Sequence, residues 1–111
     1  MSRGTHFGDL ELLVMLALVR LDQNAYGVSI AREIAETGKR RVALGSVYAA
    51  LERLEERGLV KSSLGEATPE RGGRAKRYFQ ITGLGMRELQ ATRKALISMW
   101  QNVPTLEGGK A

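Results

Sequence analysis

The sequence predicts a mainly α-helical domain with one small β-hairpin, an α+β fold. The chain has 111 residues, of which 43% are hydrophobic and 26% charged, so it is long and apolar enough for one domain with a core. Four segments repeat their apolar residues at helical spacing, and two short segments alternate apolar and polar residues as strands do. These observations predict three helices, then a hairpin, then a fourth helix.

The first two predicted helices differ in pattern. Residues 9–21 are almost continuously apolar, which indicates a helix buried on most sides; a buried strand would fit the pattern but not the length. A second helix is expected from an N-cap at Asn24 to about Glu36, before the helix-ending Gly38. Its apolar positions share one face: Tyr26, Ile30 and Ile34.

A third helix is predicted over residues 44–57, ending at Gly58. Its apolar positions project within roughly 80° of one another at 100° per residue, which defines a core face. These positions are Leu44, Val47, Leu51 and Leu54.

Two strands are expected after the third helix, at residues 59–64 and 76–81. The connecting loop, residues 65–75, is polar and carries Pro69 and a Gly72-Gly73 pair, as hairpin loops often do. Phe79 and Ile81 alternate with polar neighbours and are expected to cover the core. Because a two-stranded hairpin is unstable alone, it must pack on the helices.

The last helix is expected over residues 83–103, capped by Thr82. Leu89, Leu96 and Val103 repeat every seven residues, with Met86 and Trp100 at the complementary positions. A heptad stripe that follows the domain predicts pairing with a second copy of the chain. Trp100 is the single tryptophan, and at such a position dimer or core packing is the more common role than a ligand platform.

Three helices followed by a hairpin are the element order of a winged helix-turn-helix, whose second motif helix enters the DNA major groove. The predicted architecture is therefore a winged helix-turn-helix with a C-terminal dimerisation helix. Residues 1–81 form the DNA-binding domain with a loose arm at 1–8, residues 82–103 the dimerisation helix, and residues 104–111 a flexible tail.

The predicted recognition helix carries small residues opposite its core face, at Ser46, Ala49 and Ala50. Small side chains let the backbone approach base edges, and Arg53 and Tyr48 are expected to make polar contacts. On their own these residues also fit an ordinary solvent-facing helix. The element order and the basic wing favour the interpretation that this helix binds DNA. Direct readout of the bases is expected to be modest.

The net charge of the chain also indicates that its binding partner is a polyanion. The chain has 17 Lys and Arg against 12 Asp and Glu, a net charge of +5 and a pI near 10.0. The wing is expected to neutralise phosphates or enter the minor groove, since it gathers basic residues beside a glycine pair. Candidate DNA contacts outside the recognition helix are Tyr26, Lys39, Arg40, Arg71, Gly73, Arg74, Lys76 and Arg77. For Lys39 and Arg40, a solvated turn is an equally good interpretation.

Other functional classes fit less well. His6 is the single histidine and lies in the arm, and no cysteine is present, so neither a catalytic constellation nor a metal or cofactor site is expected. The absence of cysteine fits a cytoplasmic protein, and the apolar run of the first helix is too short to span a bilayer. A winged helix that binds only protein is the main alternative, but its wing would be acidic or apolar.

Four strings carry a resemblance to a known family. They are A-Y-G-V-S-I-A at residues 25–31, G-S-V-Y-A-A-L-E-R-L-E-E-R-G-L-V at 45–60, E-R-G-G-R-A-K-R-Y-F at 70–79 and I-T-G-L-G at 81–85. Each is weak alone, but in combination the sequence resembles the short PadR-like transcriptional regulators, over roughly residues 10–89. The resemblance places Tyr48 and the basic residues of the wing at DNA.

The resemblance also implies a homodimer held by the N-terminal and C-terminal helices, which adds Leu10 and Leu13 to the expected interface. It implies binding to an inverted repeat of double-stranded DNA, usually as a repressor. Some members of the family release DNA when a flat aromatic compound binds between the C-terminal helices. Trp100 is compatible with such an effector site.

Overall fold

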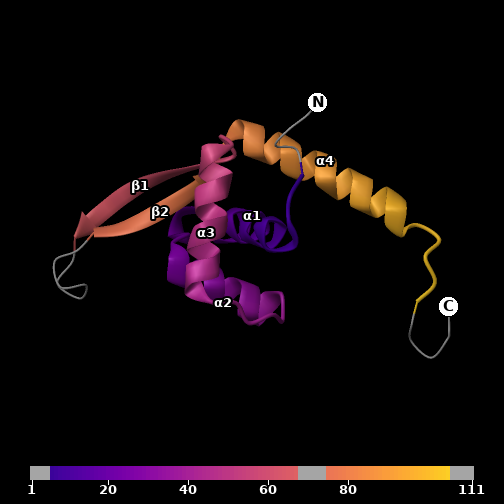
Figure 1. The fold of residues 1–111 in the computed structure, drawn as a ribbon, viewed down its shortest axis with the longest axis horizontal. Helices are drawn as coiled ribbons and strands as arrows, with labels where there is room; N and C mark the ends of the chain where they lie inside the picture. The colour runs from indigo at the N-terminus through magenta and orange to yellow at the C-terminus, as the bar shows by residue number, and fades with distance from the viewer. Residues whose placement is uncertain (1–5, 68–74, 106–111) are drawn as a thin grey trace.

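The computed structural model describes residues 6–67 and 75–105. The chain forms α1 (Asp9–Leu21), the short 3₁₀ turn η1 (Asp22–Asn24), α2 (Gly27–Thr37), α3 (Leu44–Glu56), β1 (Val60–Ala67), β2 (Ala75–Ile81) and α4 (Gly83–Trp100). Helices α1, α2 and α3 pack together, the hairpin projects on one side of them, and α4 projects on the other (Figure 1). This is the predicted α+β order.

The second helix begins later than expected. Residues 22–24 form the turn η1, and Tyr26 rather than Asn24 is the N-cap of α2. The reason is Ser29, whose hydroxyl accepts a hydrogen bond from the Tyr26 amide at 2.9 Å and donates one to the Asn24 carbonyl at 2.6 Å. Ser29 thereby satisfies an amide that the helix cannot and fixes the turn before it.

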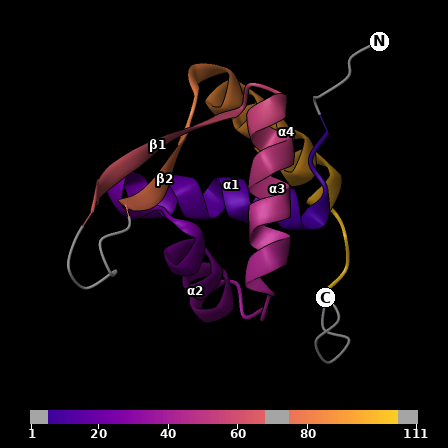
Figure 2. The same cartoon turned by 60° about the vertical axis from the view of Figure 1, so that its left-hand side comes forward.

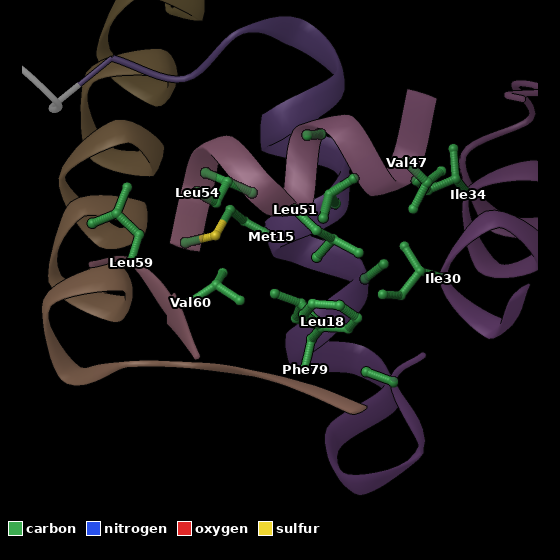
Figure 3. Close-up of a cluster of buried hydrophobic side chains, with 14 of the residues drawn as sticks. Met15, Leu18, Ile30, Ile34, Val47, Leu51, Leu54, Leu59, Val60 and Phe79 are labelled. Atoms are coloured by element: carbon green, nitrogen blue, oxygen red, sulfur yellow. The ribbon is translucent and has the colours of Figure 1, made fainter. Parts of the chain in front are cut away.

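The core lies where α1, α2, α3 and the hairpin meet (Figure 3). Met15 and Leu18 of α1 contribute to it, together with Leu51 of α3 and Phe79 of β2. Two sequence-based expectations for α3 are wrong. Leu44 is 41% exposed because it is the first residue of the helix, and Ala50 is completely buried rather than on the solvent face.

The hairpin is longer than expected and is joined to the second helix. β1 and β2 pair antiparallel from Val60 opposite Ile81 to Ala67 opposite Ala75, with an irregularity between Leu64 and Ala67. The Phe79 amide donates to the Ala25 carbonyl at 2.9 Å, beside an isolated bridge between Tyr26 and Tyr78. The chain just before α2 therefore fixes the base of the wing.

Helix α4 starts at the predicted cap, where the Thr82 hydroxyl accepts from the Gly85 amide at 3.0 Å. It ends at Trp100, three residues before the expected end, because the chain leaves the helical conformation at Gln101 and reaches a positive φ of 67° at Asn102. α4 contacts α1 and extends away from the other helices (Figure 1), and in the view of Figure 2 it lies behind α3. Its last two turns carry exposed apolar side chains.

Candidate nucleic-acid interface

The first half of α3 presents small and aromatic side chains to solvent. Ser46 and Ala49 are exposed, and Tyr48 is 42% exposed. The Tyr48 ring lies 6.4 Å from the ring of Phe79 in β2, so the recognition helix and the wing meet here. The second half of α3 exposes Glu52 and Glu56, whose charge would repel phosphates. The N-terminal half of α3 is therefore the part suited to a DNA groove.

Gly27 makes room for Tyr48. A Cβ atom built on Gly27 would lie 2.3 Å from the Tyr48 hydroxyl oxygen, far inside contact distance. Glycine at the first position of α2 thus lets the Tyr48 ring approach that helix closely. The pairing explains why a glycine follows Tyr26, which the pattern of apolar residues did not explain.

A basic residue of the wing, Lys76, lies against Tyr26, whose ring in turn meets that of Tyr78 in the wing. The rings of Tyr26 and Tyr78 meet edge to face with centroids 5.7 Å apart, and the Lys76 ammonium lies 4.1 Å from the centre of the Tyr26 ring. This cation–π contact fixes Lys76 at the edge of β2. Arg77, the next residue along the strand, is exposed. Arg71, Gly73 and Arg74, also expected to contact DNA, lie outside the described residues.

Arg53 is placed differently from the expectation that it faces DNA. Its Nε donates to Oε2 of Glu11 in α1 at 2.8 Å, so the guanidinium is turned toward α1. Local sequence patterns could not predict this pair, because the two residues are 42 positions apart.

Glu11 is a buried carboxylate that collects several donors. Oε1 accepts from the Gly8 amide at 2.9 Å and from Arg57 Nη1 at 3.2 Å, in addition to the Arg53 bond on Oε2. Burial by itself raises the pKa of Glu11, but the Arg53 and Gly8 hydrogen bonds and the charges of Arg57 and Arg53 together hold that pKa below its usual value. The fold therefore stabilises the charged form of Glu11.

The turn between α2 and α3 is also tied to α1. Arg40 forms an ion pair with Asp9, while Lys39 is exposed in the left-handed conformation with a φ of 56°. Two of the cations expected at DNA, Arg40 and Arg53, are thus paired with acids in the first turn of α1. These acids were missed from the sequence because helix-start acids are ordinary features of a helix N-terminus.

An apolar groove lies between α1 and α4, with the C-terminal end of α2 at its border, and has a volume of about 900 Å³. Several residues expected at the dimer interface line it: Leu13, Met86, Leu89, Leu96 and Trp100. Leu10 is half-buried and Val103 exposed, but neither lines the groove. Leu89 is already buried in the core of its own chain, whereas Leu96 and Trp100 are 43% and 67% exposed. Leu12, Leu16 and Ile97 also line the groove and were not singled out from the sequence.

No helix in the described part of the chain is long and apolar enough to cross a membrane. Among residues 6–67 and 75–105, no three histidine or acidic side chains gather in a way that would hold a metal ion.

Comparison with known proteins decides the family. The profile of the transcriptional regulator PadR-like family matches residues 15–91, which include α1 from Met15 onward, the recognition helix, the wing and the first half of α4. This chain belongs to the PadR-like family of transcriptional regulators. The PadR-like regulators bind DNA, and so does this one. The resemblance read from four short strings is thus confirmed.

Solved structures agree in fold. A PadR-like transcription factor from Bacteroides fragilis is 26% identical with a TM-score of 0.70, covering 81% of this chain and 82% of that one. A PadR family regulator from Eggerthella lenta is also 26% identical, with a TM-score of 0.66 and coverage of 82% and 79%. A PadR family regulator from Clostridium difficile is 23% identical with a TM-score of 0.66, covering 83% and 91%. No curated protein matches this chain.

Membership in the PadR-like family establishes the functional class and the fold of the chain. The family is one of transcriptional regulators, not of enzymes. The winged helix-turn-helix is confirmed as the fold.

Proposed function

We propose that this PadR-like regulator binds an inverted-repeat operator as a homodimer and represses transcription. One observation carries the DNA-facing part of the proposal: Tyr48 on the recognition helix contacts Phe79 of the wing and lies on Gly27 of α2. Three elements thereby share one face. On it lie the exposed Ser46 and Ala49 and the basic wing strand.

The contacts on this face sort into two kinds. Ser46, Tyr48 and Ala49 are expected to meet base edges, because they lie on the first turns of the helix that enters the groove. Lys76 and Arg77, with Arg71, Gly73 and Arg74 of the loop, are expected to meet phosphates or the minor groove. Lys39 lies in the turn before the helix and is proposed as a further phosphate contact.

The groove between α1 and α4 supports the homodimer. Its lining is mostly aliphatic and includes the exposed Leu96, Ile97 and Trp100 of the projecting helix. Apolar side chains gathered on a helix that leaves the body gain free energy when a second copy covers them. A two-fold dimer places two recognition helices on two half-sites, which is the geometry an inverted repeat requires.

Repression and effector release follow from the same elements. A dimer that occupies an operator within a promoter blocks the promoter without any further activity. Trp100 lines the groove and is 67% exposed, so a flat aromatic compound can stack on its indole. We assign the effector site to Trp100 on this ground.

The proposal is tested by selecting duplexes from a random library with the purified protein and titrating the selected duplex with salt. The parent is expected to select an inverted repeat and to lose affinity steeply with salt, as phosphate neutralisation requires. Replacing Lys76 and Arg77 by alanine should reduce the slope of log affinity against log salt by about 2, since each phosphate contact contributes roughly one.

The matched control replaces Arg87 and Lys94 by alanine, two exposed cations of α4 that do not line the groove. The same loss of charge at this distant place should leave the slope almost unchanged. Equal slopes for the wing pair and the α4 pair would refute the wing assignment, and a flat salt response of the parent would refute DNA binding through phosphates.

A further inference from the structure

A cluster of three charged side chains joins α1 to the C-terminal end of the recognition helix, and the proposed function does not use it. Glu11 is 8% exposed, and its carboxylate binds Arg53 Nε at 2.8 Å and Arg57 Nη1 at 3.2 Å. Both arginines belong to the end of α3, one helical turn apart. A single side chain of α1 thus binds two residues at that end of α3.

The same cluster also forms hydrogen bonds with the backbone that precedes α1. The Gly8 amide donates to Glu11 Oε1 at 2.9 Å, and Arg57 Nη2 donates to the His6 carbonyl at 2.7 Å. The Arg57 guanidinium also lies 5.5 Å from the centre of the Phe7 ring. The chain before α1, the first turn of α1 and the end of α3 are therefore held as one unit.

The opposite face of α1 borders the groove proposed for the second copy. Leu12 and Leu13 follow Glu11 directly and line that groove. Helix α1 thus lies between the proposed dimer interface and the recognition helix. In a two-fold dimer built on this groove, the α1–α3 angle sets how far apart, and at what tilt, the two recognition helices lie.

We propose that Glu11 is a positioning residue that fixes the recognition helix relative to the dimer interface and thereby sets the half-site spacing that the regulator accepts. The inference rests on the proposed homodimer and operator. Glu11 is not proposed to touch DNA. Hydrogen bonds between charged groups are directional, so this cluster restrains the orientation of α3 more than apolar contacts of the same area do.

The test measures the affinity of Glu11→Gln for a series of selected inverted repeats whose half-sites are moved apart or together by single base pairs. The parent is expected to show one preferred spacing. For Glu11→Gln we expect about a tenfold loss at that spacing and little or no loss one base pair away, so that the profile flattens. Each duplex is measured at a temperature where thermal unfolding shows the variant to be folded.

A matched control separates this effect from charge. Glu55→Gln changes the net charge equally at another hydrogen-bonded carboxylate, which accepts from the Ser62 hydroxyl and does not line the groove. General electrostatics predicts that both variants bind DNA slightly more tightly. A loss at the preferred spacing for Glu11→Gln, against no loss for Glu55→Gln, is therefore opposite in sign to the effect of charge alone.

Glu11→Asp gives a second, charge-neutral test if the glutamine variant fails to fold. Its carboxylate is one methylene shorter and cannot reach both arginines, so the same flattening is expected. An unchanged spacing profile in a folded Glu11→Asp or Glu11→Gln variant would overturn the inference, whatever the variant does to thermal stability. If the parent itself selects no inverted repeat, the proposed function fails first, and the two failures are distinguishable.

Discussion

The Tyr48 phenol occupies the space that any side chain at Gly27 would need. A Cβ at Gly27 would lie 2.3 Å from the Tyr48 hydroxyl and 2.4 Å from Cζ. The recognition helix therefore presents its aromatic residue in a position defined by a residue of another helix. This relation makes the placement of a proposed DNA contact testable without changing the contact itself.

Gly27→Ala is expected to alter DNA binding more than folding. The clashing atoms belong to the far end of a half-exposed side chain, so Tyr48 can swing outward, and the free energy of unfolding should fall by no more than about 1.5 kcal/mol. Operator affinity should fall nearly as far as in Tyr48→Ala. Fluorescence anisotropy with labelled duplex measures the affinities, and full affinity in Gly27→Ala would mean that the position of Tyr48 does not matter.

Two other glycines are expected to respond in opposite ways. A Cβ at Gly85 would lie 2.2 Å from the Leu59 carbonyl oxygen, a backbone atom that cannot move alone, whereas nothing lies within 4 Å at Gly45. Gly85→Ala should lower the free energy of unfolding by about 3 kcal/mol. Gly45→Ala should be neutral or stabilise by up to about 1 kcal/mol, because alanine favours helix. Urea unfolding decides between them, and similar effects would contradict the described packing at Gly85.

Glu11 predicts a pH dependence of stability. Its pKa is held below the ordinary value near 4.5 in the folded chain, so the stabilisation is fully present above that value and is lost as pH falls through the folded pKa. Glu11→Gln should therefore be less stable than the parent by about 1 to 2 kcal/mol at pH 7. The difference should shrink as the pH falls through the lowered pKa of Glu11, because the carboxylate is then protonated in the folded chain. Urea unfolding at pH 7 and at a series of acidic pH values measures it, and a constant difference would refute the assignment.

Leu96→Glu is expected to yield monomers, because it places a charge among the exposed apolar residues of the groove. The control is Ala95→Glu, one residue away on the same helix and outside the groove lining. Light scattering should report monomers for the first and dimers for the second. Dimers in both would place the interface elsewhere. Leu89 is a poor probe, since its burial within one chain makes Leu89→Glu a folding defect.

Much of the fold was predictable from local patterns. The apolar run of residues 9–21, the glycines at 38 and 58 and the alternation around Phe79 predicted the order and approximate bounds of the elements, because helix and strand periodicities are written locally. Misplaced bounds had local chemical causes, such as the Ser29 hydroxyl at the start of α2. Ala50 is buried because of the way α3 packs on its neighbours. Periodicity places the boundary of a helix's buried face only to within one residue, so it did not predict this burial.

The candidate interface divides in the same way. The element order, the basic wing and the heptad stripe of α4 could be predicted without a structure, since charge and periodicity depend on neighbours along the chain. Three relations could be seen only in the folded chain: Arg53 turns to Glu11, Tyr48 lies on Gly27, and α1 and α4 line one groove. Each joins residues of different helices that are far apart in the sequence and become neighbours only when the helices pack.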